Sequence, residues 1–161
     1  MKVLGIDPGT AECGYGIVHA SDGRLRAVCH GLWRTPPGER VELRLRTIYE
    51  GVAGLLEEHE LDAVALEESY VGADARIALS VGQARGAVLL AGVLAGVECA
   101  EYAPARVKQT VCGYGRADKA QVQRMVRMIL GVEEPMSDHA SDALAVAVCH
   151  ATAPPLLKVA G

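Results

Sequence analysis

Apolar and polar residues follow two periods along this chain, and each period predicts one type of element. Short apolar runs between turn residues predict strands over residues 2–7, 14–19, 25–33, 62–67 and 97–102. Apolar residues three and four positions apart predict helices over residues 45–56, 75–96, 118–130 and 137–150. A leading three-strand meander followed by β-α-β crossovers predicts an α/β fold with a mixed sheet covered by helices.

The helix predicted over residues 75–96 is unusually rich in glycine and alanine. Glycine lowers helix propensity, so we expect a packing interaction that compensates for it. Close approach of another helix is the natural explanation.

Length and composition predict one soluble domain. The chain has 161 residues, half of them apolar, and we assign residues 1–152 to the domain and 153–161 to a short tail. The net charge of -4 argues mildly against a nucleic-acid partner, although the distribution of charge matters more than its sum. The most apolar stretch, 87–97, is too short to span a bilayer. The five cysteines are scattered without a C-x-x-C pair, which predicts free thiols in a reducing cytoplasm.

Four side chains that can bind metal lie where predicted elements end or begin. Asp7 and Glu67 each close an apolar strand, and His139 and Asp142 lie three residues apart at the start of the last helix. Three carboxylates and an imidazole in one pocket repel or desolvate one another unless a cation is present. The pattern therefore predicts a divalent-metal site.

Each of these positions also has a simpler interpretation. Asp7-Pro8-Gly9 is a common turn, Glu67 could begin an exposed loop, and Ser137 or Asp138 could cap a helix. Asp142 is followed by the apolar run 143–148, which draws it towards the interior.

Basic residues recur between positions 106 and 127. They are Arg106, Lys108, Arg116, Lys119, Arg124 and Arg127. Such a stripe suits a phosphate backbone, although a solvated helix face is the commoner outcome. Arg76 and Arg85 can join it, and Tyr70 can stack on a base. Together with the four side chains that can bind metal, the stripe predicts a phosphodiester nuclease in which two ions lie roughly 3.5–4 Å apart.

Several motifs, in order, resemble the RuvC family of Holliday-junction resolvases over nearly the whole length. They are Asp7-Pro8-Gly9-Thr10 with Gly14-Tyr15-Gly16, Leu66-Glu67-Glu68, Gly82-Gln83-Ala84-Arg85-Gly86, Val107-Lys108-Gln109-Thr110-Val111 with Gly113-Tyr114-Gly115, and Asp142-Ala143-Leu144-Ala145. The resemblance implies an RNase H-like fold: a five-stranded mixed sheet, three antiparallel meander strands then parallel strands, with helices on both faces.

The resemblance also implies an activity and its setting. A homodimer in the bacterial cytoplasm would cut four-way DNA junctions by symmetric nicks on opposing strands, leaving 5′-phosphate and 3′-hydroxyl ends. It would need two Mg²⁺ or Mn²⁺ ions and would work with the branch-migration proteins RuvA and RuvB in recombination and repair. Packing of two copies of helix 75–96 would bury Val81 and Leu89, with packing inside one chain as the alternative.

The resemblance assigns roles to individual residues of this chain. The metal ligands are Asp7, Glu67, His139 and Asp142, and the basic pair beside the scissile phosphate is Lys108 and Lys119. Lys119 joins the four ligands as a catalytic residue, and the expected DNA contacts are Tyr70, Arg76, Lys108, Arg116 and Lys119.

One departure from the family pattern affects the ligand set. Many relatives carry Asp-x-x-Asp in the closing motif, whereas this chain has His139 three residues before Asp142. Imidazole can bind a divalent ion, and Asp138 is the alternative ligand. Two rival functions are an actin- or hexokinase-like phosphotransferase, for which the chain is too short, and a junction-binding module without catalysis.

Overall fold

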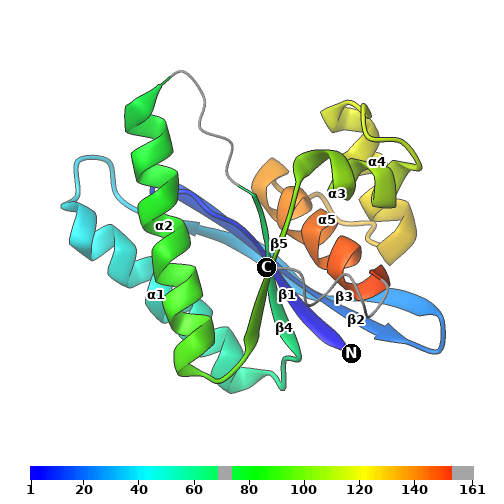
Figure 1. Cartoon of the computed structure of the whole chain (residues 1–161), viewed down its shortest axis with the longest axis horizontal. Helices are drawn as coiled ribbons and strands as arrows, with labels where there is room; N and C mark the ends of the chain where they lie inside the picture. Colours follow the sequence, from blue (N-terminus) through cyan, green and yellow to red (C-terminus); the bar gives the residue numbers. More distant parts are fainter. Residues whose placement is uncertain (69–73, 154–161) are drawn as a thin grey trace.

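The protein is built around one five-stranded sheet (Figure 1). The structure, a computed structural model, describes residues 1–68 and 74–153. The strands are β1 (Lys2–Asp7), β2 (Glu12–Ser21), β3 (Arg24–Arg34), β4 (Ala63–Glu67) and β5 (Glu98–Tyr102), in the spatial order β3-β2-β1-β4-β5. Strands β1, β2 and β3 form the antiparallel meander, and β4 and β5 run parallel to β1. The predicted mixed sheet is confirmed.

Helices cover both faces of the sheet, as predicted. Helices α1 (Val41–Glu58) and α2 (Ala75–Leu94) lie on one face, and α3 (Pro104–Cys112), α4 (Lys119–Leu130) and α5 (Asp138–Thr152) lie on the other (Figure 1). Alternate strand residues serve the two layers: Leu4 packs with α1 and α2, whereas Val3 packs with α3, α4 and α5. Central strands covered on both faces require the continuous apolar run seen in β1.

Helix α3 was not predicted. It has only nine residues, and Val107 and Val111 are its only buried positions. Two apolar residues four apart do not establish a helical period in a sequence. Pro104 at the first turn and Gly113 in the left-handed conformation (φ 84°) mark its two ends.

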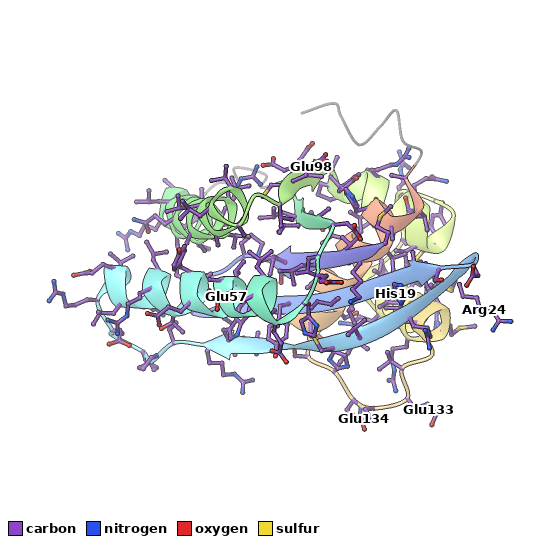
Figure 2. The ribbon with its side chains drawn as sticks, turned by 90° about the horizontal axis from the view of Figure 1, so that it is seen from below. His19, Arg24, Glu57, Glu98, Glu133 and Glu134 are labelled. Atoms are coloured by element: carbon purple, nitrogen blue, oxygen red, sulfur yellow. The ribbon has the colours of Figure 1, made fainter. Side chains whose placement is uncertain are left out.

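The β2–β3 hairpin is longer than the apolar pattern indicates, because polar residues at both ends are also paired. Its register runs from the Glu12–Arg34 pair to the Ser21–Arg24 pair. The turn between the strands places Asp22 and Gly23 at positive φ (52° and 73°), which is the backbone that a tight two-residue hairpin requires. Charged side chains such as Arg24, labelled in Figure 2, point outward from this layered fold.

Helix α2 is built into the domain on one face and exposed on another. Its buried residues include Ala84 and Val88, and at Gly92 an added Cβ would lie 2.4 Å from the Cys99 sulfur of β5. The small residues on this face therefore serve packing inside the chain. Gly82 and Gly86, by contrast, have open space beside them.

The sequence led us to expect that the apolar stretch 87–97 is too short to span a bilayer, but the whole of helix α2 is longer than this stretch. Within residues 1–68 and 74–153, α2 alone is long and apolar enough to cross a membrane by length and composition. Arg85 in its middle is paired with Glu101 of β5 and is mostly shielded from solvent. This pairing fits a helix packed on a sheet edge, while Leu79, Leu90 and Val93 on another face of α2 are exposed.

Helix α5 lies directly on the backbone of β1 and β2. An added Cβ at Gly5 would lie 1.9 Å from the carbonyl oxygen of Ala143, and one at Gly14 would lie 2.2 Å from that of His139. Gly5 is opposite Gly16 in the β1–β2 ladder, and an added Cβ at Gly16 would lie 2.6 Å from the side chain of Leu144. We call Gly5, Gly14 and Gly16 the glycine seat of α5.

The glycine seat should tolerate no side chain. We expect Gly5→Ala to lower the free energy of unfolding by about 3 kcal/mol, because the methyl group meets backbone atoms that cannot rotate away. Gly54→Ala is the matched control: it lies in α1 with open space beside it, and alanine there should stabilise the protein by about 1 kcal/mol. Urea unfolding of both variants measures the difference, and equal stabilities would contradict the seat.

Candidate active site

Two carboxylates of the site come from neighbouring parallel strands. The β1–β4 ladder ends with the pair Ile6 and Leu66, and the next residues, Asp7 and Glu67, are the last residues of their strands, so they lie side by side at the edge of the sheet. Strand β1 ends here because Pro8 has no N–H with which to continue the ladder. The same edge of the sheet lies beneath the first turns of α5.

Helix α5 supplies the other half of the site. Ser137 caps it by accepting a hydrogen bond from the Ala140 N–H at 3.1 Å, which fixes where the helix begins. His139 and Asp142, three residues apart, then face the strand ends. Gly14 lets the first turn of α5 approach β2 closely enough to bring His139 beside Asp7.

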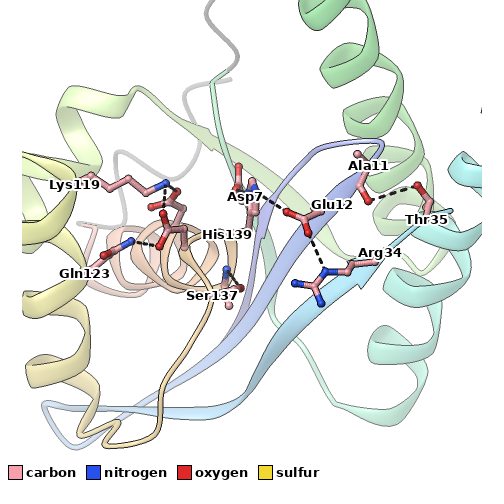
Figure 3. A network of polar contacts seen from close by, with 12 residues as sticks. Asp7, Ala11, Glu12, Arg34, Thr35, Lys119, Gln123, Ser137 and His139 are labelled. Carbon is pink, nitrogen blue, oxygen red and sulfur yellow. Dashed lines mark hydrogen bonds and ion pairs between the residues drawn. The ribbon is translucent and has the colours of Figure 1, made fainter. Parts of the chain in front are cut away.

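His139 lies between two carboxylates (Figure 3). Its Nδ1 lies 2.6 Å from Oδ2 of Asp7, and its Nε2 lies 3.3 Å from Oε2 of Glu12. The other oxygen of Glu12 accepts a hydrogen bond from Nε of Arg34 at 2.9 Å. The imidazole thus links the end of β1 to the β2–β3 hairpin.

Lys119 lies against the carboxylates of α5. Its Nζ is 3.2 Å from Asp142 and 3.3 Å from Asp138. Lys119 is the first residue of α4, and a capping box between Asp118 and Gln121 fixes that start. The flanking charges raise the pKa of Lys119 against the opposing effect of its partial burial.

Glu67 carries the largest pKa shift of the site's carboxylates. Burial, and then the negative charges of Asp142 and Asp7, raise its pKa from 4.5 to about 7, against the opposing charges of Lys108 and Lys119. Burial also raises the pKa of Asp142, partly offset by Lys119. These couplings join Asp7, Glu67 and Asp142 into one group of carboxylates, which we call the acidic cluster, and place Lys108 and Lys119 beside it.

The acidic cluster has the donors that a divalent ion prefers. Across residues 1–68 and 74–153, no three His, Cys, Asp or Glu side chains are arranged at metal-binding spacing. Instead, His139 contacts Asp7 and Lys119 contacts Asp142. Carboxylate oxygens with an imidazole suit Mg²⁺ or Mn²⁺, and the raised pKa of Glu67 reflects a negative charge that such an ion would neutralise.

Asp138 points away from the acidic cluster. It accepts a hydrogen bond from Gln123 at 2.7 Å, and this bond and Lys119 lower its pKa. Its side chain is well exposed, whereas His139 contacts Asp7 directly.

The other predicted DNA contacts lie at different distances from the site. Lys108 of α3 is close enough to lower the pKa of Glu67. Arg116, in the turn before α4, and Arg76, at the start of α2, are exposed. Tyr70 lies outside the described residues.

Two contacts at the site were not found from the sequence. Arg85 donates a hydrogen bond from Nη1 to the Glu67 carbonyl at 3.4 Å and pairs with Glu101, so it ties α2 to the end of β4 rather than joining the basic stripe. Glu12 is the second. The alternation of β2 offered a signal, because Glu12 and Gly14 are two apart and share a face of the strand.

The fold and the acidic cluster define a nuclease of the RNase H-like class. The model of the family described as crossover junction endodeoxyribonuclease RuvC matches residues 3–150. The chain therefore belongs to the RuvC family, whose members are metal-dependent endodeoxyribonucleases.

Curated relatives and solved structures agree with this assignment. RuvC of Moorella thermoacetica is 52% identical over 96% of this chain and 93% of its own, and RuvC of Syntrophomonas wolfei is 48% identical over 93% and 88%. The structure of T. thermophilus RuvC in complex with Holliday junction substrate superposes with a TM-score of 0.89 at 40% identity, covering 94% of this chain and 93% of that one. The fowlpox virus resolvase, at 10% identity and a TM-score of 0.58, shares the fold.

The raised pKa of Glu67 should make the metal-free protein less stable as pH rises. The folded state keeps this proton up to about pH 7, whereas the unfolded chain releases it near 4.5, so stability falls between these values. In EDTA, Glu67→Gln should therefore raise Tm by a few degrees at pH 8 and by much less at pH 4.5.

Glu68→Gln is the matched control, because Glu68 is the exposed neighbour of Glu67. Thermal unfolding at the two pH values measures both variants. An equal gain for both would show that removing any negative charge, rather than relieving the acidic cluster, raises Tm.

Proposed function

We propose that this protein resolves four-way DNA junctions by paired, symmetric nicks on opposing strands. The acidic cluster formed by β1, β4 and α5, with two lysines beside it, carries the proposal. Membership of the RuvC family and similarity to a RuvC that binds Holliday junction substrate support it. In this proposal residues 1–152 form the nuclease domain.

Asp7, Glu67, His139 and Asp142 would hold two Mg²⁺ or Mn²⁺ ions. When bound, the ions would supply Lewis-acid chemistry for the attack of water and the departure of the 3′ oxygen, and the products would carry 5′-phosphate and 3′-hydroxyl ends. Because imidazole is a softer ligand than carboxylate, a site that includes His139 would bind Mn²⁺ at least as well as Mg²⁺. Asp138 would serve as the fourth ligand only if its contacts to Gln123 and Lys119 were given up.

The chain's own cations have a separate part in the reaction. Lys119 contacts Asp142 of the acidic cluster. In contact with a phosphate, its ammonium would offset the negative charge that develops there. Lys108 would add a second positive charge from α3. Arg116 and Arg76 would contact the DNA backbone further out, and Tyr70 would stack on a base at the junction.

The exposed face of α2 is the proposed dimer interface. Leu79, Leu90 and Val93 are 64%, 51% and 69% exposed, and together with Gly82 and Gly86 they share one helix face. The open space beside both glycines allows a second helix to approach closely. Leu89 packs partly against the core of its own chain, so the interface lies one position further round the helix than the sequence suggested.

A two-fold dimer matches the symmetry of the substrate. Paired cuts on opposing strands need two active sites related by a rotation, and an isologous interface provides them. The proposal places the dimer in the bacterial cytoplasm, in recombination and repair, where it acts on junctions handled by RuvA and RuvB.

Junction cleavage tests the proposed function directly. A labelled synthetic four-way junction and a linear duplex of the same sequence are incubated with Mn²⁺, Mg²⁺ or EDTA. We expect symmetric, metal-dependent nicks in the junction alone, and a nicking rate at least 100-fold lower in Lys119→Ala, because the phosphate loses its cation.

Arg24→Ala is the control for the loss of one positive charge, because Arg24 is exposed at the distant β2–β3 turn. Its nicking rate should match that of the unmodified protein. Junction binding without cleavage in either metal would refute the nuclease and leave a non-catalytic junction-binding module.

The dimer interface gives a further prediction. Leu90→Glu should convert the dimer to monomer in light scattering and should replace paired nicks by single ones, because it places charge at the centre of the apolar face. Met128→Glu, on an exposed apolar residue of α4, should leave the mass unchanged. A dimer that survives Leu90→Glu would rule out this face of α2.

A further inference from the structure

Glu12 contacts His139 but is not one of the proposed metal ligands. One of its oxygens lies 3.3 Å from Nε2 of His139, and the other accepts the hydrogen bond from Arg34 at 2.9 Å. Figure 3 shows Glu12 between these two side chains, on the side of the imidazole away from Asp7. His139 therefore has a carboxylate on each of its two ring nitrogens.

The position of Glu12 follows from the sheet. Glu12 and Arg34 are direct cross-strand partners in the β2–β3 ladder, which places their side chains within reach of one another. Glu12 also shares a strand face with Gly14, on which the first turn of α5 rests. The hairpin and the helix thus hold the Glu12 carboxylate within 3.3 Å of the His139 imidazole.

The two ring nitrogens of a neutral imidazole cannot have the same role. One carries hydrogen and donates, and the other offers a lone pair. Nδ1, 2.6 Å from Asp7, is the nitrogen that faces the acidic cluster. If Nδ1 binds an ion with its lone pair, the hydrogen must be on Nε2, where an acceptor is required.

We propose that Glu12, held by Arg34, is a positioning residue that fixes His139 as the Nε2–H tautomer and so turns the Nδ1 lone pair towards the metal. A carboxylate only accepts hydrogen bonds, so without an ion Asp7, 2.6 Å from Nδ1, favours hydrogen on that nitrogen. Once an ion takes the Nδ1 lone pair, Glu12 is the acceptor placed to receive hydrogen from Nε2. A carboxylate behind a metal-bound histidine also fixes the ring plane and increases the basicity of the bound nitrogen. The inference rests on the proposed metal site.

The role is specific to histidine at position 139. An aspartate there has no second donor to direct, so Glu12 would only add negative charge near the site. The effect of losing Glu12 should therefore depend on which residue occupies position 139. An ordinary surface ion pair between Glu12 and Arg34 would show no such dependence.

Metal binding without DNA provides the test. Mn²⁺ is titrated into the full chain, and free Mn²⁺ is followed by electron paramagnetic resonance. Glu12→Ala should weaken Mn²⁺ binding by about 10- to 100-fold. Glu12→Gln, whose amide oxygen still accepts a hydrogen bond, should recover part of this loss.

The same titration is repeated with His139→Asp. In that background, Glu12→Ala should change Mn²⁺ affinity by less than about twofold, since no ring needs orienting. Glu50→Ala, which breaks a comparable exposed ion pair with Arg46 in α1, is the matched control and should leave the affinity unchanged. Equal losses from Glu12→Ala in both backgrounds would overturn the inference.

Nitrogen-15 NMR of the histidine rings reads the tautomer independently of affinity. With Mg²⁺ bound, the unmodified protein should show hydrogen on Nε2 of His139, and Glu12→Ala should reach this state only at a higher Mg²⁺ concentration. Hydrogen on Nδ1 in the Mg²⁺-loaded unmodified protein would overturn the inference. If the unmodified protein shows no Mn²⁺ binding that Asp7→Asn removes, the metal site itself fails. If that binding is present but insensitive to Glu12→Ala, only the role of Glu12 fails.

Discussion

The direct contact between α5 and the bare backbone of β1 and β2 is the constraint on which the rest of the structure depends. The glycine seat removes the layer of side chains that normally separates a helix from a sheet, so α5 lies at backbone distance from the strands. That distance decides whether His139 and Asp142 reach the ends of β1 and β4. The core on this face, from Val107 of α3 to Val126 of α4, then packs around the position of α5.

The acidic cluster lowers the stability of the free protein, because it gathers negative charges that a bound cation would neutralise. Glu67 and Asp142 are both partly buried and disfavour one another's charge. Lys119 and His139 reduce this cost without removing it, as the raised pKa of Glu67 records. Such local destabilisation is typical of sites whose binding partner completes them.

The sequence predicted the parts of the site that follow from strand ends and helix starts. Asp7 and Glu67 close apolar runs, and a helix period brings His139 and Asp142 to one face, so their convergence follows from the topology. Contacts that depend on tertiary packing were not predictable in this way. Arg85 binds the end of β4, and Glu12 contacts His139, and both contacts join residues far apart in the chain. Helix α3 was too short to show a helical period in the sequence.

The placement of Lys119 has a consequence for how DNA binding responds to salt. Its ammonium already lies between the carboxylates of Asp138 and Asp142, so it has few counterions to release when a phosphate arrives. Binding would exchange one anionic neighbour for another around a fixed positive charge. The logarithmic slope of affinity against salt concentration should therefore be shallower than the number of basic residues at the interface suggests. Ionic strength would then act mainly through the outer cations, and far less through the one closest to the chemistry.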